Sequence, residues 1–227
     1  MTKVTYFGHS CFLVETKGTK ILFDPFITPN ALAKEIKLES IWCDYIFVFH
    51  GHDDHIADLE AIALQTKAKI VGSFELCVWL EKKGFTNTHS MNIGGEWDFG
   101  FAKVKMVNAV HSNSLPDGTY GGKAAGYVIQ NDETCFYYAG DTALNFDMKL
   151  IADSYTLDFA FLPIGSNYTM SAKDAAIASE FINCKKIIGM HYDTFGLIKI
   201  NHKEALDEFT KKSCELDLLS IGETISK

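Results

Sequence analysis

The sequence has few proline residues, 4 in 227, and it contains no proline- or glycine-rich tract, no block of like charge and no short-period repeat. Nothing therefore marks a linker between domains. With 47% hydrophobic residues, a chain of this length can bury a substantial core. We therefore expect a single domain that spans residues 1–227.

The sequence also lacks a Cys-x-x-Cys pair, and no apolar run is long enough to cross a bilayer. The six cysteines are scattered, mostly within apolar runs: Cys11, Cys43, Cys77, Cys135, Cys184 and Cys214. Their spacing indicates free thiols in a reducing compartment rather than a disulfide framework. The chain enters a strand-like run directly after Met1-Thr2-Lys3, without an apolar signal region. We expect a soluble, cytoplasmic protein without membrane contact.

A continuous basic stripe, which long nucleic acids require, is missing as well. The net charge is −8, and the lysines are dispersed, some of them as pairs such as Lys82-Lys83 and Lys211-Lys212. This charge pattern argues against nucleic acid as a partner. It favours a compact small-molecule substrate, such as a lactone, a phosphodiester or a phosphorylated metabolite.

The segment 50–55, His-Gly-His-Asp-Asp-His, is by contrast rich in metal-binding side chains and follows the apolar run 45–49. Alternate side chains of an extended chain share a face, so His50 and His52 can bind one cation while the turn at Asp54-His55 directs two donors to another. Imidazole and carboxylate without thiolate suit zinc, iron, manganese or nickel. The alternative is that Asp53 or Asp54 caps the helix expected next, and capping and ligation are compatible.

Three later segments share one design, an apolar run followed at once by a potential ligand. Residues 104–110 lead into His111, 135–140 into Asp141, and 186–190 into His191. Taken singly, the histidines could be core residues and Asp141 could form an Asx turn. Their succession behind a histidine-rich loop favours ligands, because α/β folds gather active-site groups where strands end.

The remaining patterns predict stacked sheets between helical layers. Strands are expected at 3–7, 11–16, 20–24, 45–49, 69–71, 91–93, 96–99, 101–109, 125–130, 135–139, 159–163, 186–189 and 217–220. Helices are expected at 55–65, 74–83, 145–155, 171–182 and 202–210. A hairpin turn at 130–133 and a helix cap at Ser171 support these boundaries. His89 and His202 lie in polar surroundings, and we interpret both as surface residues.

In these motifs the chain resembles the metallo-β-lactamase superfamily, whose motifs are an early Asp, His-x-His-x-Asp-His, a lone His, a lone Asp and a last His. Here they are Asp24, segment 50–55, His111, Asp141 and His191. Segments 8–12, 162–170 and 191–195 are similar to the uncharacterised UPF0173-like metal-dependent hydrolases, which are related to ascorbate-phosphate lactonases. Gly196 stands where that group is expected to have proline. The resemblance implies an α+β fold, a four-layer αββα sandwich with the metals at one sheet edge.

The resemblance also implies how the ligands divide between two metal ions, zinc foremost, with manganese, iron and nickel as further candidates. His50, His52 and His111 would hold the first metal; Asp54, His55 and His191 would hold the second; and Asp141 would bridge them. Two cations about 3.5–4 Å apart can activate a shared hydroxide as the nucleophile. Asp24 would orient the histidine loop, although a turn residue before Pro25 is equally compatible with the sequence.

Asp54, His9 and Asn167 are the residues expected to take part in catalysis, because the resemblance places the last two near the metals: His9 as a group that supports the ligands or faces the substrate, and Asn167 as one that can reach the substrate. Each of these two would otherwise be an ordinary turn or loop residue. The expected activity is hydrolysis of a small ester, lactone or phosphodiester. The alternatives are a metal-dependent oxidoreductase of the same fold and a metal-binding module without activity. Self-association into a homo-oligomer is implied by the resemblance alone.

Overall fold

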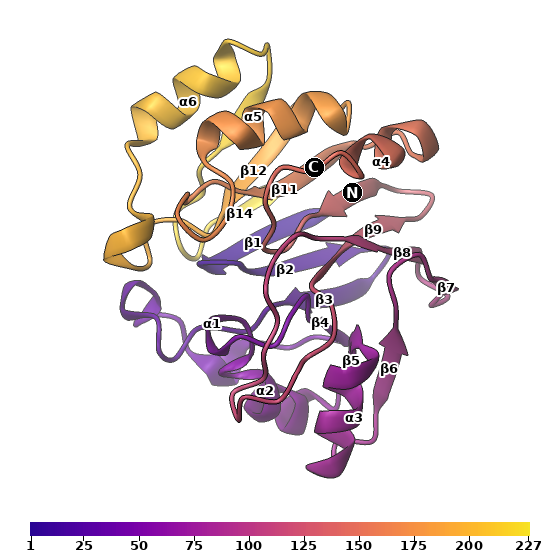
Figure 1. Cartoon of the computed structure of the whole chain (residues 1–227). Helices are drawn as coiled ribbons and strands as arrows, with labels where there is room; N and C mark the ends of the chain where they lie inside the picture. The colour runs from indigo at the N-terminus through magenta and orange to yellow at the C-terminus, as the bar shows by residue number, and fades with distance from the viewer.

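Two seven-stranded sheets stack face to face in the computed structural model, which describes residues 1–227 (Figure 1). In order across the first sheet, the strands are β14 (Thr224–Ser226), β1 (Lys3–Gly8), β2 (Cys11–Thr16), β3 (Thr19–Phe23), β4 (Tyr45–Phe47), β5 (Lys69–Ser73) and β6 (Thr88–Met91). In order across the second sheet, they are β13 (Glu215–Asp217), β12 (Lys186–Met190), β11 (Phe159–Pro163), β10 (Cys135–Tyr138), β9 (Ala125–Gln130), β8 (Lys103–Asn108) and β7 (Glu96–Asp98). Each sheet combines antiparallel pairs with three parallel ones.

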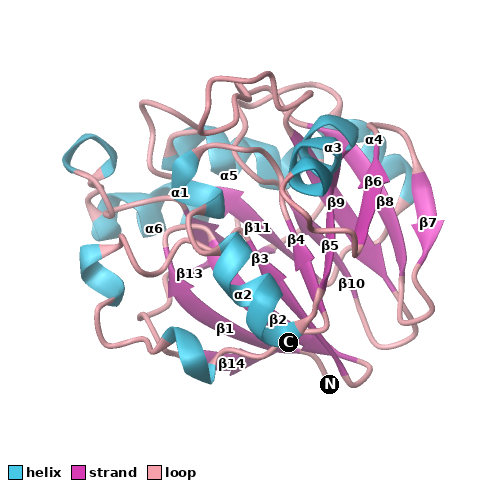
Figure 2. Cartoon of the chain, turned by 90° about the horizontal axis from the view of Figure 1, so that it is seen from below, coloured by secondary structure: helices cyan, strands magenta, loops and turns pink.

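Helices cover the outer face of each sheet and complete four layers, so the predicted αββα sandwich is confirmed (Figures 1 and 2). On the side of the first sheet lie α1 (Asp53–Ile56), α2 (Leu59–Thr66) and α3 (Phe74–Lys82). On the side of the second sheet lie α4 (Met148–Ser154), α5 (Ala172–Phe181) and α6 (His202–Thr210). Three short 3-10 helices are η1 (Ala31–Ala33), η2 (Leu38–Ser40) and η3 (Gly196–Ile198). None of the helices has both the length and the hydrophobicity needed to cross a membrane.

Aromatic side chains fill the space between the two sheets. Phe23 of the first sheet stacks on Tyr138 of the second with ring centroids 4.3 Å apart, and Phe49 stacks on the same tyrosine at 4.6 Å. Phe12 meets Phe161 edge to face at 4.8 Å. Such pairs contribute about 0.5–1.5 kcal/mol each beyond the burial of their surface. Because Phe49 directly precedes the segment 50–55 and Tyr138 lies on β10, which leads to Asp141, this packing holds these two ligand-bearing loops in fixed relation.

The predicted helix 55–65 is wrong in one respect, because the chain forms two helices, α1 and α2, with a break at Ala57-Asp58. Asp58 accepts hydrogen bonds from the backbone N–H groups of Ile27 (2.6 Å) and Thr28 (2.8 Å). These two bonds tie the start of α2 to the segment after β3. No local pattern encodes that partner.

Strand predictions are least accurate at the sheet edges. The expected strand 217–220 is found at Glu215–Asp217, the expected strand 91–93 at Thr88–Met91, and β14 was not predicted. Each of these edge strands is three or four residues long and pairs with a strand on one side only, so it carries little hydrophobic alternation. The β9–β10 hairpin and the capping box at Ser171 are confirmed.

Candidate metal centre

Four strand ends deliver metal-binding side chains to one place. The loops that follow β4, β8, β10 and β12 carry, in that order, the segment 50–55, His111, Asp141 and His191. Their donor atoms form three overlapping groups within each of which all atoms lie within 4.8 Å of one another. These groups contain every residue predicted as a ligand and add His9: His9, His50, His52, Asp54, His55, His111, Asp141 and His191. The residues are therefore gathered as the strand-end pattern indicated.

One group consists of His50, His52 and His111, which we call the histidine triad. His50 Nε2 lies 2.9 Å from His52 Nδ1. The side chain of His50 is fully buried, whereas that of His111 is 12% exposed and His52 is half-buried. The triad is therefore an all-nitrogen donor set on the more open side of the centre.

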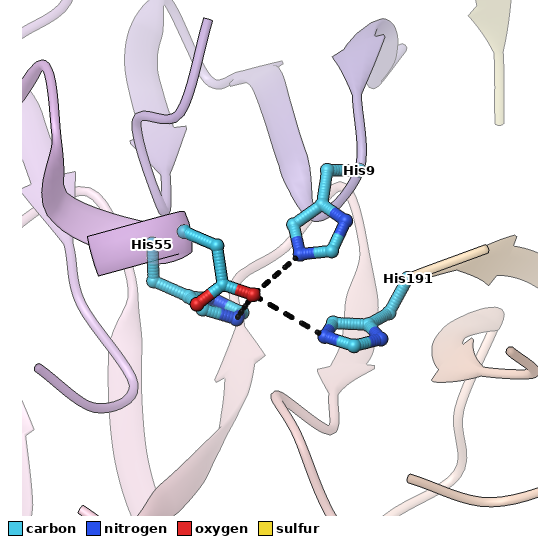
Figure 3. Close-up of side chains that lie close together, drawn as sticks. His9, His55 and His191 are labelled. Atoms are coloured by element: carbon cyan, nitrogen blue, oxygen red, sulfur yellow. Dashed lines mark hydrogen bonds and ion pairs between the residues drawn. The ribbon is translucent and has the colours of Figure 1, made fainter. Parts of the chain in front are cut away.

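A second group consists of His9, Asp54, His55 and His191, which we call the aspartate tetrad. Asp54 Oδ2 lies 3.1 Å from His9 Nε2, 3.8 Å from His191 Nε2 and 3.9 Å from His55 Nε2. The three histidine rings converge on this oxygen from three separate segments (Figure 3). Asp54 therefore does not cap α1; the N-cap position is His52, whose side chain makes no capping bond.

Asp141 lies between the two groups. Its Oδ2 is 2.9 Å from His191 Nε2 and 3.4 Å from His55 Nε2, both in the tetrad. The same oxygen is 3.6 Å from His111 Nε2 and 4.0 Å from His50 Nε2, both in the triad. The carboxylate is 2% exposed. One carboxylate within reach of both donor sets has the placement that a bridging ligand requires.

Asp24 holds the ring of His55 from behind. Its Oδ2 lies 2.7 Å from His55 Nδ1, and its Oδ1 accepts a hydrogen bond from Phe49 N at 3.2 Å. Burial raises the pKa of Asp24 to about 6, against the opposing effect of His55. A carboxylate at Nδ1 keeps the proton on that nitrogen and leaves Nε2 to act as a donor toward the centre. This contact suits the orienting role, and the left-handed backbone of Asp24 at φ 41° places it in a turn as well.

Four buried side-chain atoms of the centre lack a hydrogen-bond partner: His50 Nδ1, His55 Nε2, Asp141 Oδ1 and His191 Nδ1. Such atoms are costly in a folded protein unless something binds them. His55 Nε2 faces the carboxylates of Asp54 and Asp141 at 3.9 and 3.4 Å, which indicates a cation as its missing partner, and the surrounding donors are nitrogen and oxygen without sulfur. That set suits zinc, iron, manganese or nickel in sites with open positions. The residues present therefore fit divalent transition metals.

The two groups differ in their electrostatics. Burial lowers the pKa of every histidine of the triad. At His55 and His191 of the tetrad, burial has the same tendency, but Asp141 and Asp54 together raise the pKa of His191 to about 9, and Asp141 with Asp24 raises that of His55 well above its usual value. The neighbouring histidines likewise overcome burial at Asp54 and Asp141 and hold both carboxyl pKa values well below the ordinary range. The triad is thus neutral, and the tetrad is a network of ion pairs.

His9 is buried beside Asp54, which matches the first of its two expected places, behind the ligands. Its side chain is fully buried, with Nε2 facing Asp54 and Nδ1 2.9 Å from Thr194 Oγ1. Burial, followed by the neighbouring His191, lowers its pKa to about 4. In this structure His9 contacts Asp54 and Thr194, so it would reach a substrate through Asp54. Its backbone at φ 56° is left-handed, and its carbonyl accepts a hydrogen bond from His191 N at 3.0 Å.

Asn167 lies exposed on the loop after β11, with a left-handed backbone at φ 56° and no side-chain hydrogen bond within the chain. The loop starts against the ligand-bearing turn, because a Cβ added at Gly165 would lie 2.0 Å from the carbonyl oxygen of His191. A free carboxamide on a loop that packs beside His191 is available to bind a substrate.

Two contacts around the centre were not predicted from the sequence. Thr194, noted only as part of the segment 191–195, bonds His9, and Asn113 bonds the backbone of Gly51 between two triad histidines. A lone asparagine in a polar loop gives no signal of such a partner. His89 and His202 lie outside the groups, as expected, although His202 Nε2 pairs with Asp193 Oδ2 at 2.6 Å.

A family model, curated relatives and a solved structure all show similarity to metal-dependent hydrolases or to their superfamily domain. The model of the Beta-lactamase superfamily domain matches residues 3–191. A UPF0173 metal-dependent hydrolase from Flavobacterium johnsoniae is 52% identical over 98% of this chain and 99% of its own, and one from Bacillus subtilis is 42% identical with the same coverage. Igni18, a metallo hydrolase from the archaeon Ignicoccus hospitalis, is 34% identical and superposes with a TM-score of 0.89 over 99% of this chain and 97% of its own.

Proposed function

The chain belongs to the metallo-β-lactamase superfamily and is a metal-dependent hydrolase of the UPF0173 group, and from this premise we propose that it hydrolyses a small ester, lactone or phosphodiester at a centre of two metal ions. Zinc is the foremost candidate, followed by manganese, iron and nickel. We place the reaction in the cytoplasm, in keeping with six cysteines that are all free.

The observation that carries the proposal is the position of Asp141, whose carboxylate lies within 4.0 Å of histidines from both the triad and the tetrad. In this proposal the triad binds the first metal. Asp54, His55 and His191 bind the second, and Asp141 bridges the two. A single-metal centre would not need a buried carboxylate between two separate donor sets.

Two divalent cations supply a nucleophile by lowering the pKa of bound water, and they polarise the carbonyl or phosphoryl oxygen of the substrate. The chain supplies the orientation. Asp54 is the most exposed side chain of the tetrad, at 27%, and its low pKa keeps it ionised, so it accepts hydrogen bonds rather than storing a proton. His9 fixes the rotamer of Asp54 from the buried side, and Asn167 offers a carboxamide to the substrate from the exposed side.

A compact substrate follows from the charge of the molecule. The net charge of −8 and the dispersed lysines give a long polyanion no continuous surface to bind. Neither nucleic acid nor a membrane is part of the proposal. An ester, lactone or phosphodiester requires only the two metals and a few polar groups at the rim.

The test is to count metals per chain by plasma emission spectrometry and to screen the metal-loaded protein against model phosphodiesters, lactones and thioesters. We expect up to two metals and turnover of at least one of these classes. His89→Ala is the matched control for histidine substitutions, because His89 lies outside both groups and packs on Trp97 and Phe99.

Other results would support the alternatives. Flavin absorbance or oxygen consumption by the metal-loaded protein would favour an oxidoreductase. A protein that retains no metal after loading would favour a module without activity. Saturation at a single metal would contradict the two-metal centre while leaving the family assignment intact.

A further inference from the structure

Asn113 joins the two loops that supply the histidine triad. Its Oδ1 accepts a hydrogen bond from Gly51 N at 2.7 Å, and Gly51 stands between His50 and His52. Its Nδ2 donates to Gly121 O at 2.7 Å, within the loop that begins at His111. Asn113 is 9% exposed, so water has little access to either hydrogen bond. One carboxamide thus connects the backbone of both triad segments.

Both glycines are needed for this close approach. A Cβ at Gly121 would lie 2.4 Å from Asn113 Oδ1, and a Cβ at Gly51 would lie 2.5 Å from Leu115 Cδ2, in a side chain that is buried against the loop. A carboxamide can accept one hydrogen bond and donate another from a single planar group, which neither a carboxylate nor an alkyl side chain of that size can do. Asn113 therefore matches its two partners by chemistry and by space.

The same loop is held at other points that do not touch the triad. Ser73, the N-cap of α3, donates from Oγ to Gly121 O at 2.6 Å, and Trp79 Nε1 donates to Asp117 Oδ2 at 2.7 Å. These bonds attach the loop to α3. Only the bond from Gly51 to Asn113 joins the loop to the backbone between two triad histidines.

We propose that Asn113 is a positioning residue that sets the distance of His111 from His50 and His52 and thereby controls metal binding at the triad alone. It touches neither the metal nor the substrate. The inference rests on the proposed two-metal centre, and it adds that the two metal positions have separate supports: Asn113 for the triad, and Asp24 with His9 for the tetrad.

The test measures the affinity of Asn113→Leu and Asn113→Asp for the first and for the second metal ion, by competition with a chromophoric chelator. Leucine removes both bonds. We expect it to weaken the triad metal about 10- to 100-fold, the usual effect of losing a partner that orients ligands, and to leave the tetrad metal unchanged. Aspartate keeps the acceptor for Gly51 and loses the donor for Gly121, so we expect a smaller loss.

The visible absorption of the cobalt(II)-loaded protein provides a readout that is independent of activity, because it reports coordination geometry. The bands of the triad cobalt should shift or weaken in Asn113→Leu and stay unchanged in Trp79→Phe, which removes an exposed anchor of the same loop. The melting temperature of the metal-free variants serves as the control for folding.

Three outcomes would overturn the inference. They are an equal loss of affinity for both metal ions, the same loss of affinity in Trp79→Phe, and a loss of affinity that is matched by a lower stability of the metal-free variant. A wild-type protein that binds a single metal would instead overturn the two-metal proposal, and the positioning inference with it. Two wild-type metals with unaltered binding in both Asn113 variants would refute the positioning inference alone.

Discussion

The two halves of the metal centre lie side by side but are built differently. The histidine triad consists of uncharged imidazoles and is held by a carboxamide that accepts from one backbone N–H and donates to one backbone carbonyl. The aspartate tetrad is a network of carboxylates and histidines, with Asp24 behind His55 and Thr194 behind His9. Neutral supports cost little to bury, whereas buried charges require partners on every side. We therefore expect the triad to respond mainly to geometry and the tetrad mainly to charge.

Asp141→Asn is the substitution that should affect both halves at once. The amide keeps the shape of the side chain but removes the one charge shared by the triad and the tetrad. We expect weaker binding of both metals and a loss of hydrolysis of at least about a hundredfold, with little change in the stability of the fold. Metal analysis and turnover on the substrate identified in the screen provide the measurement. Near-wild-type turnover would show that Asp141 does not bridge.

His191→Ala should separate the halves. It removes a tetrad ligand and leaves the triad complete, so we expect the stoichiometry to fall from two metals to one. Plasma emission spectrometry measures the change, with His89→Ala as the control. If the variant kept two metals, or lost both, the division into two positions would be wrong.

Asn167→Ala tests a residue that belongs to neither half. A donor aimed at the developing charge of a transition state is worth on the order of a hundredfold in rate. We expect turnover to fall by about that factor, while both metals remain bound with unchanged affinity. Unchanged turnover would make Asn167 an ordinary loop residue, and lost metal would make it part of the centre.

Asp24→Asn should weaken the tetrad and spare the triad. The amide can still bond His55, but it no longer stabilises the tautomer that frees Nε2. We expect the second metal to bind about 10- to 100-fold more weakly. Stepwise chelator competition measures both affinities. An equal effect on the two steps would mean that Asp24 supports the centre as a whole.

Proton release should distinguish the halves in the unmodified protein. At pH 7 the triad histidines, whose pKa values are lowered, are already neutral and release almost no protons on binding a metal. His55 and His191, with raised pKa values, are protonated, so the second metal should displace about two protons. Affinity for the second metal should therefore fall first as the pH decreases. Calorimetry in buffers of different ionisation enthalpy measures the difference, and equal release in both steps would contradict it.

The gathering of the candidate ligands could be predicted from the sequence, because the segment 50–55, His111, Asp141 and His191 each follow an apolar run. Runs of this kind become the buried strands whose ends meet. His111, Asp141 and His191 were found in this way without any knowledge of their neighbours. The grouping of His50 with His111, and of Asp54 with His191, came from the resemblance, since no spacing encodes it.

The features that were not predicted from the sequence depend on residues that lie far away in the chain. Strand β14 pairs with β1 from the opposite end of the sequence, and Asp58 breaks a helix to bond Ile27 and Thr28. Asn113 depends on Gly51, which precedes it by 62 residues. Local patterns carry no record of such contacts, so the support that Asn113 gives to the centre became visible only in the fold.

The hydrogen bond from His191 N to His9 O has a consequence for how the protein acquires its metal during synthesis. Residues 50–55 leave the ribosome early, but the tetrad cannot close before β12 has emerged and paired with β11. Contacts between such distant segments form late in folding. We expect a metal held by the nascent histidine segment to exchange freely, because most of its coordination positions are still open. The metal that remains is then selected by the finished fold, from whichever ions surround the chain at that moment.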